Sequence, residues 1–306
     1  MKICYFIQTH KNPEQIYRLV RTIKRSSPAA QILIGHDFNS CYLDLSPLCD
    51  LSGIDLLKIN FPIKRGNFSL IKPYLNAIDW LYKNNSEFDW LIYLSGQDYP
   101  TQPLHQMEEF LSRSSYDGFM RYWDIHSPES PWGREKGHRR YFYHYYELPD
   151  KLARWLFVRK PKVERFLPIR LYPTYGSLVG LPARSVPFNE KFSCYGGRQW
   201  HSLSRKCIDF LRIFLEQNQF LPKYYQRTIL PDESMIQTIL VNSDLFNLCN
   251  DDGRYISFAG NPAGHPRTLT TQDYETIKSE KFFFARKFDL SEDAEVLDML
   301  DARILS

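Results

Sequence analysis

Glu233 is the residue whose type and position most directly suggest chemistry. It lies in the segment Leu230-Pro231-Asp232-Glu233-Ser234, where Pro231 indicates the first position of a helix. A carboxylate in the first turn of a helix lies near the positive end of the helix dipole, which favours its ionised form. Such a carboxylate, directed out of the fold, can take a proton from a hydroxyl group as a general base. Acidic residues also favour first turns for helix stability alone, so the pattern leaves both roles open.

A second candidate site follows the apolar strand predicted over residues 90–94. Gly96 and Pro100 indicate a turn, which presents Gln97 and Asp98 just beyond the carboxyl end of that strand. Open α/β sheets bind ligands in the crevice beyond such strand ends. An ordinary exit from strand to loop is the alternative interpretation.

Cations form the third group of candidates. Arg254 precedes a predicted short strand, and Arg286 and Lys287 lie among four phenylalanines in residues 282–289. Apolar packing on both sides would fix the direction of these side chains. Most surface cations are simply solvated, so neither position is specific by itself.

Two further segments carry weaker signals. In residues 194–200 paired glycines would let the backbone approach a ligand, and Trp200 would pack on a sugar ring; a tight turn with a core tryptophan explains the same pattern. The basic run 134–140, followed by aromatic residues, resembles nucleic-acid surfaces. His138 and His144 lack partners at metal-ligand spacing, so we expect no zinc site.

Composition narrows the classes of function. The chain has 306 residues, 43% of them hydrophobic, which is enough for a substantial core, and its net charge of +4 suits anionic small molecules or an anionic membrane surface. That charge falls short of a nucleic-acid binder. No apolar stretch approaches the length of a spanning helix, and the N-terminus predicts a strand rather than a signal peptide. We therefore expect a cytoplasmic protein, peripheral on the inner face of the membrane, whose six scattered cysteines are free thiols.

Several familiar motifs are absent from the sequence. It contains no Walker-type phosphate loop, GxGxxG, GxSxG or HExxH motif, and no Asp-x-Asp pair that would hold a divalent metal on a nucleotide diphosphate. If the chain binds such a diphosphate, Arg, Lys or helix N-termini must neutralise its charge.

Alternating strands and helices must position these residues. Strands are predicted over 3–9, 32–34, 56–59 and 90–94, the second ending at residues 35–37. A regular segment is predicted over 175–181, and helices from Pro13, about Ser69, Leu104, about Ser202 and Pro231. This order indicates an α/β fold with a mostly parallel sheet flanked by helices. Residues 123–168 show no clean period and predict an irregular insertion. We expect a single domain that divides into residues 1–122, an insertion (123–172) and a C-terminal half (173–306).

Taken in order, eight segments resemble the core-2/I-branching β-1,6-N-acetylglucosaminyltransferase and peptide O-xylosyltransferase family, glycosyltransferase family 14. They span nearly the whole chain: YFIQTHKNPEQIYRLVRTI, ILIGHD, RGNFSLI, WLIYLSGQDYPTQP, YGGRQWHSLSR, LPDESMIQTIL, GRYISFAGNPAGHPRTLT and FFFARKFD. SGQDYP, PDES and ARKFD together are far more specific than any one of them.

The resemblance implies a Rossmann-like, GT-A type fold and a metal-independent, inverting UDP-sugar transferase. By position, Glu233 would be the general base, and Arg254 and Lys287 would face the UDP diphosphate. The other residues implied on the donor side are Gln8, Thr9, His10, Asp37, Arg65, Ser69, Gln97 and Asp98. Candidates on the acceptor side are Trp132, Lys136, Arg139 and Arg140 in the insertion, together with Trp200.

The resemblance favours GlcNAc or xylose as the donor sugar, and no cofactor or metal is expected. Animal members of the family carry a membrane anchor and disulfides, and this sequence shows neither. We therefore expect a glycan, lipid-linked oligosaccharide or glycoconjugate acceptor in polysaccharide biosynthesis, with no nucleic-acid partner. A catalytically silent sugar-nucleotide or glycan-binding protein of the same fold is the alternative.

Overall fold

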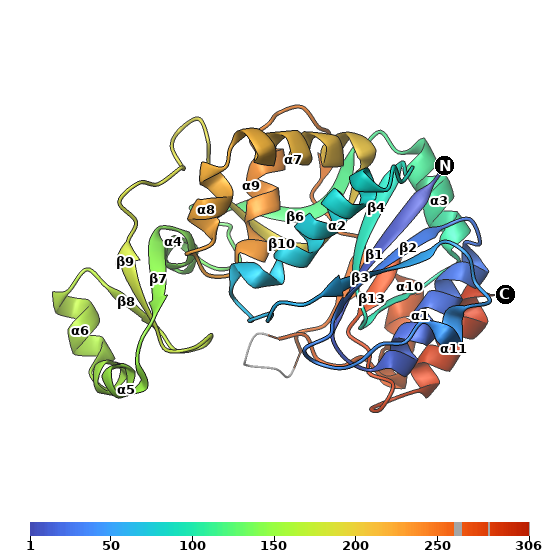
Figure 1. The fold of residues 1–306 in the computed structure, drawn as a ribbon, viewed down its shortest axis with the longest axis horizontal. Helices are drawn as coiled ribbons and strands as arrows, with labels where there is room; N and C mark the ends of the chain where they lie inside the picture. Colours follow the sequence, from blue (N-terminus) through green and yellow to red (C-terminus); the bar gives the residue numbers. More distant parts are fainter. Residues whose placement is uncertain (260–264, 281, 306) are drawn as a thin grey trace.

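A seven-stranded mixed sheet forms the centre of the molecule (Figure 1). The structure, a computed structural model, describes residues 1–259, 265–280 and 282–305. The strand order is β11-β6-β10-β4-β1-β2-β3, and the strands are β1 (Ile3–Thr9), β2 (Gln31–Asp37), β3 (Ile54–Ile59), β4 (Trp90–Ser95), β6 (Gly118–Asp124), β10 (Tyr195–Ser204) and β11 (Leu248–Cys249). Only β10 is antiparallel to its neighbours, β4 and β6; the other four pairings are parallel. The predicted α/β class with a mostly parallel sheet is confirmed.

Helices cover both faces of this sheet (Figure 1). All of β1 is buried, as expected for a strand covered on two sides. Its Tyr5 and Ile7 belong to one core cluster, with α1, α3 and α11, whereas Cys4 and Phe6 belong to the other, with α2, α7 and α9. The helices are α1 (Pro13–Ser26), α2 (Lys72–Lys83), α3 (Leu104–Arg113), α4 (Arg134–Tyr141), α5 (Asp150–Val158), α6 (Lys160–Phe166), α7 (Arg205–Gln217), α8 (Phe220–Tyr225), α9 (Met235–Val241), α10 (Tyr274–Ser279) and α11 (Glu295–Ile304).

A small sheet ties the C-terminal region to the loop that follows β4. Its order is β12-β13-β5, with β5 (Asp98–Pro100), β12 (Arg254–Ile256) and β13 (Phe284–Arg286). Strand β13 runs antiparallel to β5, and Arg286 is paired with Asp98. The cations near the C-terminus therefore lie beside the loop at the carboxyl end of β4.

The segment expected to be an irregular insertion contains regular structure. It contains α4, α5, α6 and β7 (Tyr143–Glu147). Two strands that follow residue 168, β8 (Arg170–Tyr172) and β9 (Leu178–Pro182), complete a three-stranded sheet of order β7-β9-β8. These elements project from one side of the main sheet (Figure 1). In the described part of the chain, no helix combines the length and apolar character needed to cross a membrane.

Strand β10 was not predicted. The sequence suggested a glycine turn over residues 194–200 and a helix from about Ser202, whereas Ser202 lies in β10 and the helix begins at Arg205. Gly197 explains the difference, because a Cβ atom there would lie 2.0 Å from the carbonyl oxygen of Arg121 on the neighbouring β6. The glycine permits a close approach between two strands, not a turn.

Candidate active site

A cavity of about 450 Å³ lies where the strands β1, β2 and β4 end. Its lining comes from the residues that follow these strands and from the C-terminal region near β13. It includes the predicted donor-side residues Gln8, Thr9, His10, Asp37, Arg65, Gln97 and Lys287, and also Trp200, which was predicted on the acceptor side. We call this cavity the cleft. The carboxyl ends of parallel strands thus bring residues far apart in sequence to one place.

Hydrogen bonds fix the polar side chains around the cleft. The Gln199 side-chain amide donates to the Tyr93 hydroxyl at 2.7 Å, and that hydroxyl donates to the side-chain oxygen of Gln8. Gln15 donates to the carbonyl oxygens of Gly96 at 2.8 Å and Phe288 at 3.1 Å. Gln15 therefore links the loop after β4 to the C-terminal segment, which fixes the two sides of the cleft relative to each other.

Among the residues that the structure describes, Asp37 is the only acidic one that lines the cleft. Its carboxylate accepts hydrogen bonds from the Asn39 backbone N–H and the Ser40 hydroxyl, both at 3.0 Å. These contacts order the turn that follows β2.

Cations dominate the electrostatics of the cleft. Lys11, Arg65, Arg286 and Lys287 all line it. Lys11 is 3.0 Å from Asp289, whereas Lys287 forms no ion pair with any residue that the structure describes. Positive charge in excess of acidic groups makes the cleft suited to an anion.

Two neighbouring side chains hold Arg286 in position. Its Nε atom is 3.3 Å from the buried carboxylate of Asp98, and its guanidinium carbon lies 4.2 Å from the centre of the Trp200 ring. Burial lowers the pKa of Arg286, and Asp98 opposes that effect. Asp98 itself does not line the cleft; it supports Arg286 from behind.

His265 adds a further contact to the cleft, against Arg65. A ring nitrogen of His265 is 2.6 Å from an Arg65 guanidinium nitrogen. Burial lowers the pKa of His265, and the charges of Arg65 and Lys287 lower it further.

Arg254 and Ser69, both predicted on the donor side, do not line the cleft. Arg254 is 2% exposed, and its guanidinium donates to the carbonyl oxygens of Asp252 at 2.7 Å and Tyr93 at 2.8 Å. These hydrogen bonds brace the backbone beneath the cleft. On β12, Arg254 is paired with Phe284 rather than with Arg286. Ser69 also lies outside the lining, and its hydroxyl accepts a hydrogen bond from the Lys64 backbone at 2.8 Å.

Glu233 lies in a 3-10 turn, η3 (Pro231–Glu233), that precedes α9. The expectation that it sits in the first turn of the helix is therefore not met, since α9 begins at Met235. Its neighbour Leu230 adopts the left-handed conformation with φ of 52°, which non-glycine residues rarely adopt. The Leu230 N–H donates to the Gly66 oxygen at 2.9 Å, and its oxygen accepts from the Tyr141 hydroxyl at 3.0 Å. These bonds hold a strained turn in place, as is common at functional sites.

Arg140 holds the Glu233 carboxylate. Its guanidinium donates to a Glu233 oxygen at 3.0 Å, and the Arg140 side chain is 6% exposed whereas that of Glu233 is 30% exposed. Burial raises the pKa of Glu233, and the charges of Arg140, Lys136 and Arg65 oppose that effect. The adjacent Asp232 is buried, and burial together with the charge of Glu233 raises its pKa to about 8. The pKa of Glu233 is raised overall, so the three cations offset its burial only in part.

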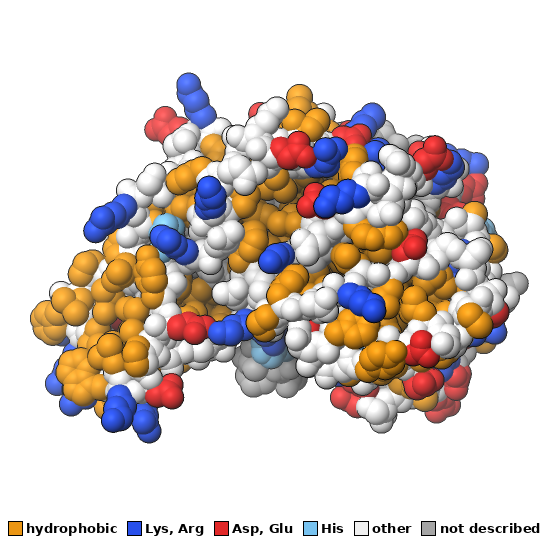
Figure 2. All heavy atoms as spheres, viewed as in Figure 1, with side chains coloured by type: hydrophobic (Ala, Val, Ile, Leu, Met, Phe, Trp, Pro, Cys, Tyr) orange, Lys and Arg blue, Asp and Glu red, His pale blue; other side chains and the backbone are white. Residues whose placement is uncertain are grey.

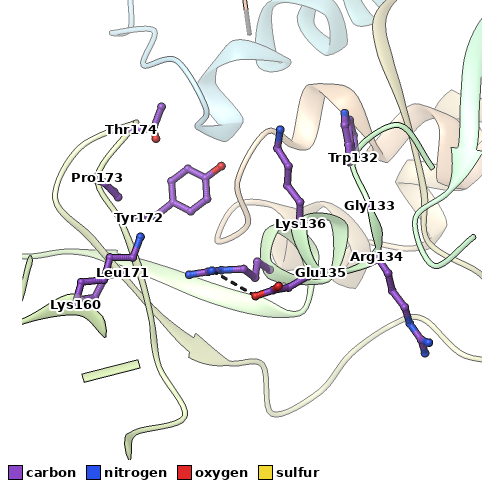
Figure 3. A pocket seen from close by; sticks show the side chains of 11 residues that line it. Trp132, Gly133, Arg134, Glu135, Lys136, Lys160, Leu171, Tyr172, Pro173 and Thr174 are labelled. Atoms are coloured by element: carbon purple, nitrogen blue, oxygen red, sulfur yellow. Dashed lines mark ion pairs between the residues drawn. The ribbon is translucent and has the colours of Figure 1, made fainter. Parts of the chain in front are cut away.

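A second cavity, of about 600 Å³, lies beside α4 (Figure 3). The predicted acceptor-side residues Trp132, Lys136 and Arg139 line it, together with Lys160 and Tyr172. In Figure 3, Lys136 and the hydroxyl of Tyr172 point into the same space, whereas Arg134 points away from it. We call this the second cavity.

Arg140 was predicted on the acceptor side but does not line the second cavity. Its guanidinium carbon lies 4.2 Å from the centre of the Trp132 ring, so it connects that wall with Glu233. Charges that act on Glu233 come from Lys136 of the second cavity and from Arg65 of the cleft. Glu233 lines neither cavity. Arg140 connects it with Trp132 of the second cavity, and the bond from Leu230 to Gly66 connects its turn with the loop that carries Arg65 of the cleft.

Residues 58–282 match the family model described as Core-2/I-Branching enzyme. The chain belongs to this family. The resemblance seen in the eight sequence segments is thereby confirmed, and the mixed sheet agrees with the GT-A type architecture that it implied.

The Core-2/I-Branching chain has several curated relatives. It is 27% identical over 256 residues to Beta-glucuronosyltransferase GlcAT14B of Arabidopsis thaliana, covering 82% of this chain and 51% of the relative. It is 22% identical over 322 residues to Xylosyltransferase 2 of Rattus norvegicus, covering 98% of this chain and 33% of the relative. The chain thus spans about half or less of these relatives' length. Among solved structures, galactosyltransferase LgtC in complex with donor and acceptor sugar analogs is 8% identical over all of this chain and 97% of LgtC, with a TM-score of 0.40.

The site residues implied by the resemblance left out several residues that line the cleft of this Core-2/I-Branching enzyme, among them Lys11, Gln199, His265 and Arg286. Each lies inside one of the segments that carried the resemblance. The strand-like context of Arg286, beside Lys287, was a usable signal. The pairing of Arg140 with Glu233 had no sequence signal, because 93 residues separate the two.

Proposed function

We propose that this chain is a metal-independent, inverting glycosyltransferase that moves a sugar from a UDP-sugar to a hydroxyl of a glycan or glycoconjugate. The observation that carries the proposal is the ion pair of Glu233 with Arg140, which packs on Trp132 of the second cavity, in a turn that is bonded to the loop carrying Arg65 of the cationic cleft. Membership of the Core-2/I-Branching family supports the same class of reaction.

In this proposal the cleft binds the UDP part of the donor. Lys287 and Arg65 supply positive charge to the diphosphate, and Arg286, oriented by Asp98, adds a third cation. Charge-assisted hydrogen bonds to phosphate oxygens are strong and can replace the role of a metal ion. Arg254 supports these residues through the backbone and does not touch the nucleotide.

Glu233 acts as the general base. It accepts the proton of the acceptor hydroxyl while that oxygen forms a bond to the anomeric carbon. The bond from the anomeric carbon to the diphosphate oxygen breaks at the same time, and UDP leaves with the electron pair. Because attack and departure lie on opposite sides of the sugar, the configuration inverts.

The acceptor occupies the second cavity. Lys136 and the hydroxyl of Tyr172 are available there for polar contacts. One side of Trp132 is taken by Arg140. Suitable acceptors are a glycan, a lipid-linked oligosaccharide or another glycoconjugate. For the donor sugar, GlcNAc and xylose remain our candidates, and the relative named beta-glucuronosyltransferase adds glucuronic acid to them.

The test is the variant Glu233→Gln, with the exposed Glu190→Gln as a matched control. Calorimetry with UDP and a panel of UDP-sugars measures donor binding, and UDP release measures turnover. We expect Glu233→Gln to bind UDP about as tightly as the natural protein and to lose roughly 10²–10⁴ in turnover. Unchanged turnover would remove Glu233 from the mechanism. Tight UDP binding without UDP release from any donor would instead indicate the catalytically silent binding protein.

A further inference from the structure

Large apolar side chains are exposed together on α5 and α6. The exposed fractions are 46% for Leu152, 52% for Trp155, 80% for Val158, 76% for Phe166 and 51% for Leu167. We call these five residues the lobe tip. They gather at one end of the molecule, over the projecting helices (Figures 1 and 2). Soluble proteins rarely leave so contiguous a group of apolar side chains in water without a function for it.

The spacing in α5 shows why this exposure is unusual. Leu152, Trp155 and Val158 recur every three residues, which places them near one face of a helix. In a helix that packs on a core this face is buried, but Ala153 is the only buried residue in α5, and α6 has none. Leu156 and Phe157 are half-buried beside Ala153, so α5 is apolar on two sides, and the side with Leu152, Trp155 and Val158 is turned away from the protein core.

Positive charge surrounds the lobe tip. Lys and Arg occupy six positions of residues 150–165, namely Lys151, Arg154, Arg159, Lys160, Lys162 and Arg165. None of them forms an ion pair with a residue in the described ranges. Of the two acidic residues in this segment, Glu164 is taken by Arg139 at 2.8 Å.

The cations also lie against the apolar rings. The guanidinium carbon of Arg159 is 4.8 Å from the centre of the Trp155 ring, and that of Arg165 is 5.6 Å from the centre of the Phe166 ring. An aromatic ring with a neighbouring cation fits the boundary between acyl chains and charged headgroups, where tryptophan is enriched.

We propose that the lobe tip docks on the surface of an anionic lipid bilayer. The apolar residues of α5 and α6 enter the headgroup region, and the surrounding lysines and arginines contact acidic headgroups. Both parts are needed, since interfacial helices bind through buried apolar area together with attraction to anionic lipid. The nine residues of α5 are too few to span a bilayer, so this contact is peripheral.

The same surface adjoins the second cavity, because Lys160 at the start of α6 lines that cavity. Docking would bring the second cavity close to the lipid surface. A lipid-linked acceptor could then reach it without leaving the membrane. This consequence, unlike docking itself, rests on the proposed function.

Sedimentation with lipid vesicles tests the docking. We expect the protein to bind vesicles that contain one quarter phosphatidylglycerol, to bind pure phosphatidylcholine at least about tenfold less, and to be released by high salt. The double variant Trp155→Ser, Phe166→Ser should lower the partition coefficient about tenfold or more. The control is Phe220→Ser, since Phe220 on α8 has the same 52% exposure as Trp155.

UDP binding and melting temperature are measured on every variant. Both should be unchanged in the double variant, because the lobe tip lies outside the cleft. Loss of vesicle binding with intact UDP binding supports docking whether or not sugar transfer is found. Equal vesicle binding by the natural protein and the double variant would overturn the proposal. So would a dimer in sedimentation equilibrium that needs Trp155 and Phe166 while vesicles are not bound, since that result assigns the surface to a second copy.

Discussion

Arg140 controls the charge of Glu233 more directly than a helix dipole would. The two side chains meet at 3.0 Å, and α9 starts only after Glu233. An opposite charge within about 4 Å lowers the pKa of a carboxylate by roughly 1–3 units, whereas burial raises it. The balance of these two effects decides at which pH Glu233 can accept a proton.

Replacing Arg140 by Met should move the acidic limb of the pH–rate profile upward by about one unit or more. A general base works only when ionised, so activity rises as the pH rises through the pKa of Glu233. Arg140 is the strongest of the charges that lower this pKa. Without it, burial raises the pKa of Glu233 further. The pH dependence of kcat/KM for UDP release measures the pKa in the free enzyme.

Arg139→Met is the matched control, since Arg139 pairs with Glu135 and Glu164 rather than with Glu233. Its acidic limb should coincide with that of the natural protein. The same profile in Arg140→Met and in the natural protein would show that Arg140 does not set the ionisation of Glu233. Circular dichroism establishes that both variants are folded.

At the scale of elements, the sequence predicts best where packing imposes a clear period. β1 occupies residues 3–9 and α1 starts at Pro13, as expected from an unbroken apolar run and from the position of the proline. The small sheet β7-β9-β8 was not predicted. Few apolar residues support it, because its core cluster contains only Tyr143, Tyr145, Ile229 and Leu230 as buried members. A segment that buries few apolar side chains has no periodic apolar pattern from which its strands could be predicted.

Gly197→Ala should destabilise the protein strongly, by roughly 2–4 kcal/mol. A Cβ atom at this position meets the backbone of β6 at 2.0 Å, and a backbone carbonyl cannot move as the end of a flexible side chain can. Because β10 holds the middle of the sheet, separating it from β6 disturbs both neighbours. Urea denaturation measures the free energy of unfolding.

Gly133→Ala separates this clash from the general effect of losing a glycine. Gly133 has a positive φ of 70°, but a Cβ there would meet no atom within 4 Å. Its ψ is 150°, and this backbone region is almost confined to glycine, so the cost should stay near 1–3 kcal/mol. A Gly197→Ala variant as stable as Gly133→Ala would mean that β10 can move away from β6 at little cost.

At the scale of the whole molecule, the cleft joins the two ends of the chain. Residues 8–12 and residues 286–287 line the same cavity, and Gln15 bonds to the backbone of Phe288. The order of the motifs and the strand-end rule were enough to predict much of this lining. The same signals could not show whether Arg254 or Arg286 lines the cleft. The answer depends on how β12 and β13 align with β5. Sheet pairing of this kind depends on contacts between distant segments.

UDP should stabilise the folded protein equally with excess EDTA and with added Mn²⁺. In the proposed cleft, lysine and arginine side chains neutralise the diphosphate, so removing metal ions takes away no binding group. At 100 times its dissociation constant, a ligand that binds only the folded state adds about 2.7 kcal/mol of stability. For a protein of this size that is a rise of roughly 4 °C in Tm. Lys287→Ala should reduce this rise, whereas the exposed Lys191→Ala should leave it unchanged. The Tm shift could instead disappear in EDTA and return with Mn²⁺, and this result would contradict a metal-independent donor site. The two ends of the chain would then need an ion to hold the nucleotide between them.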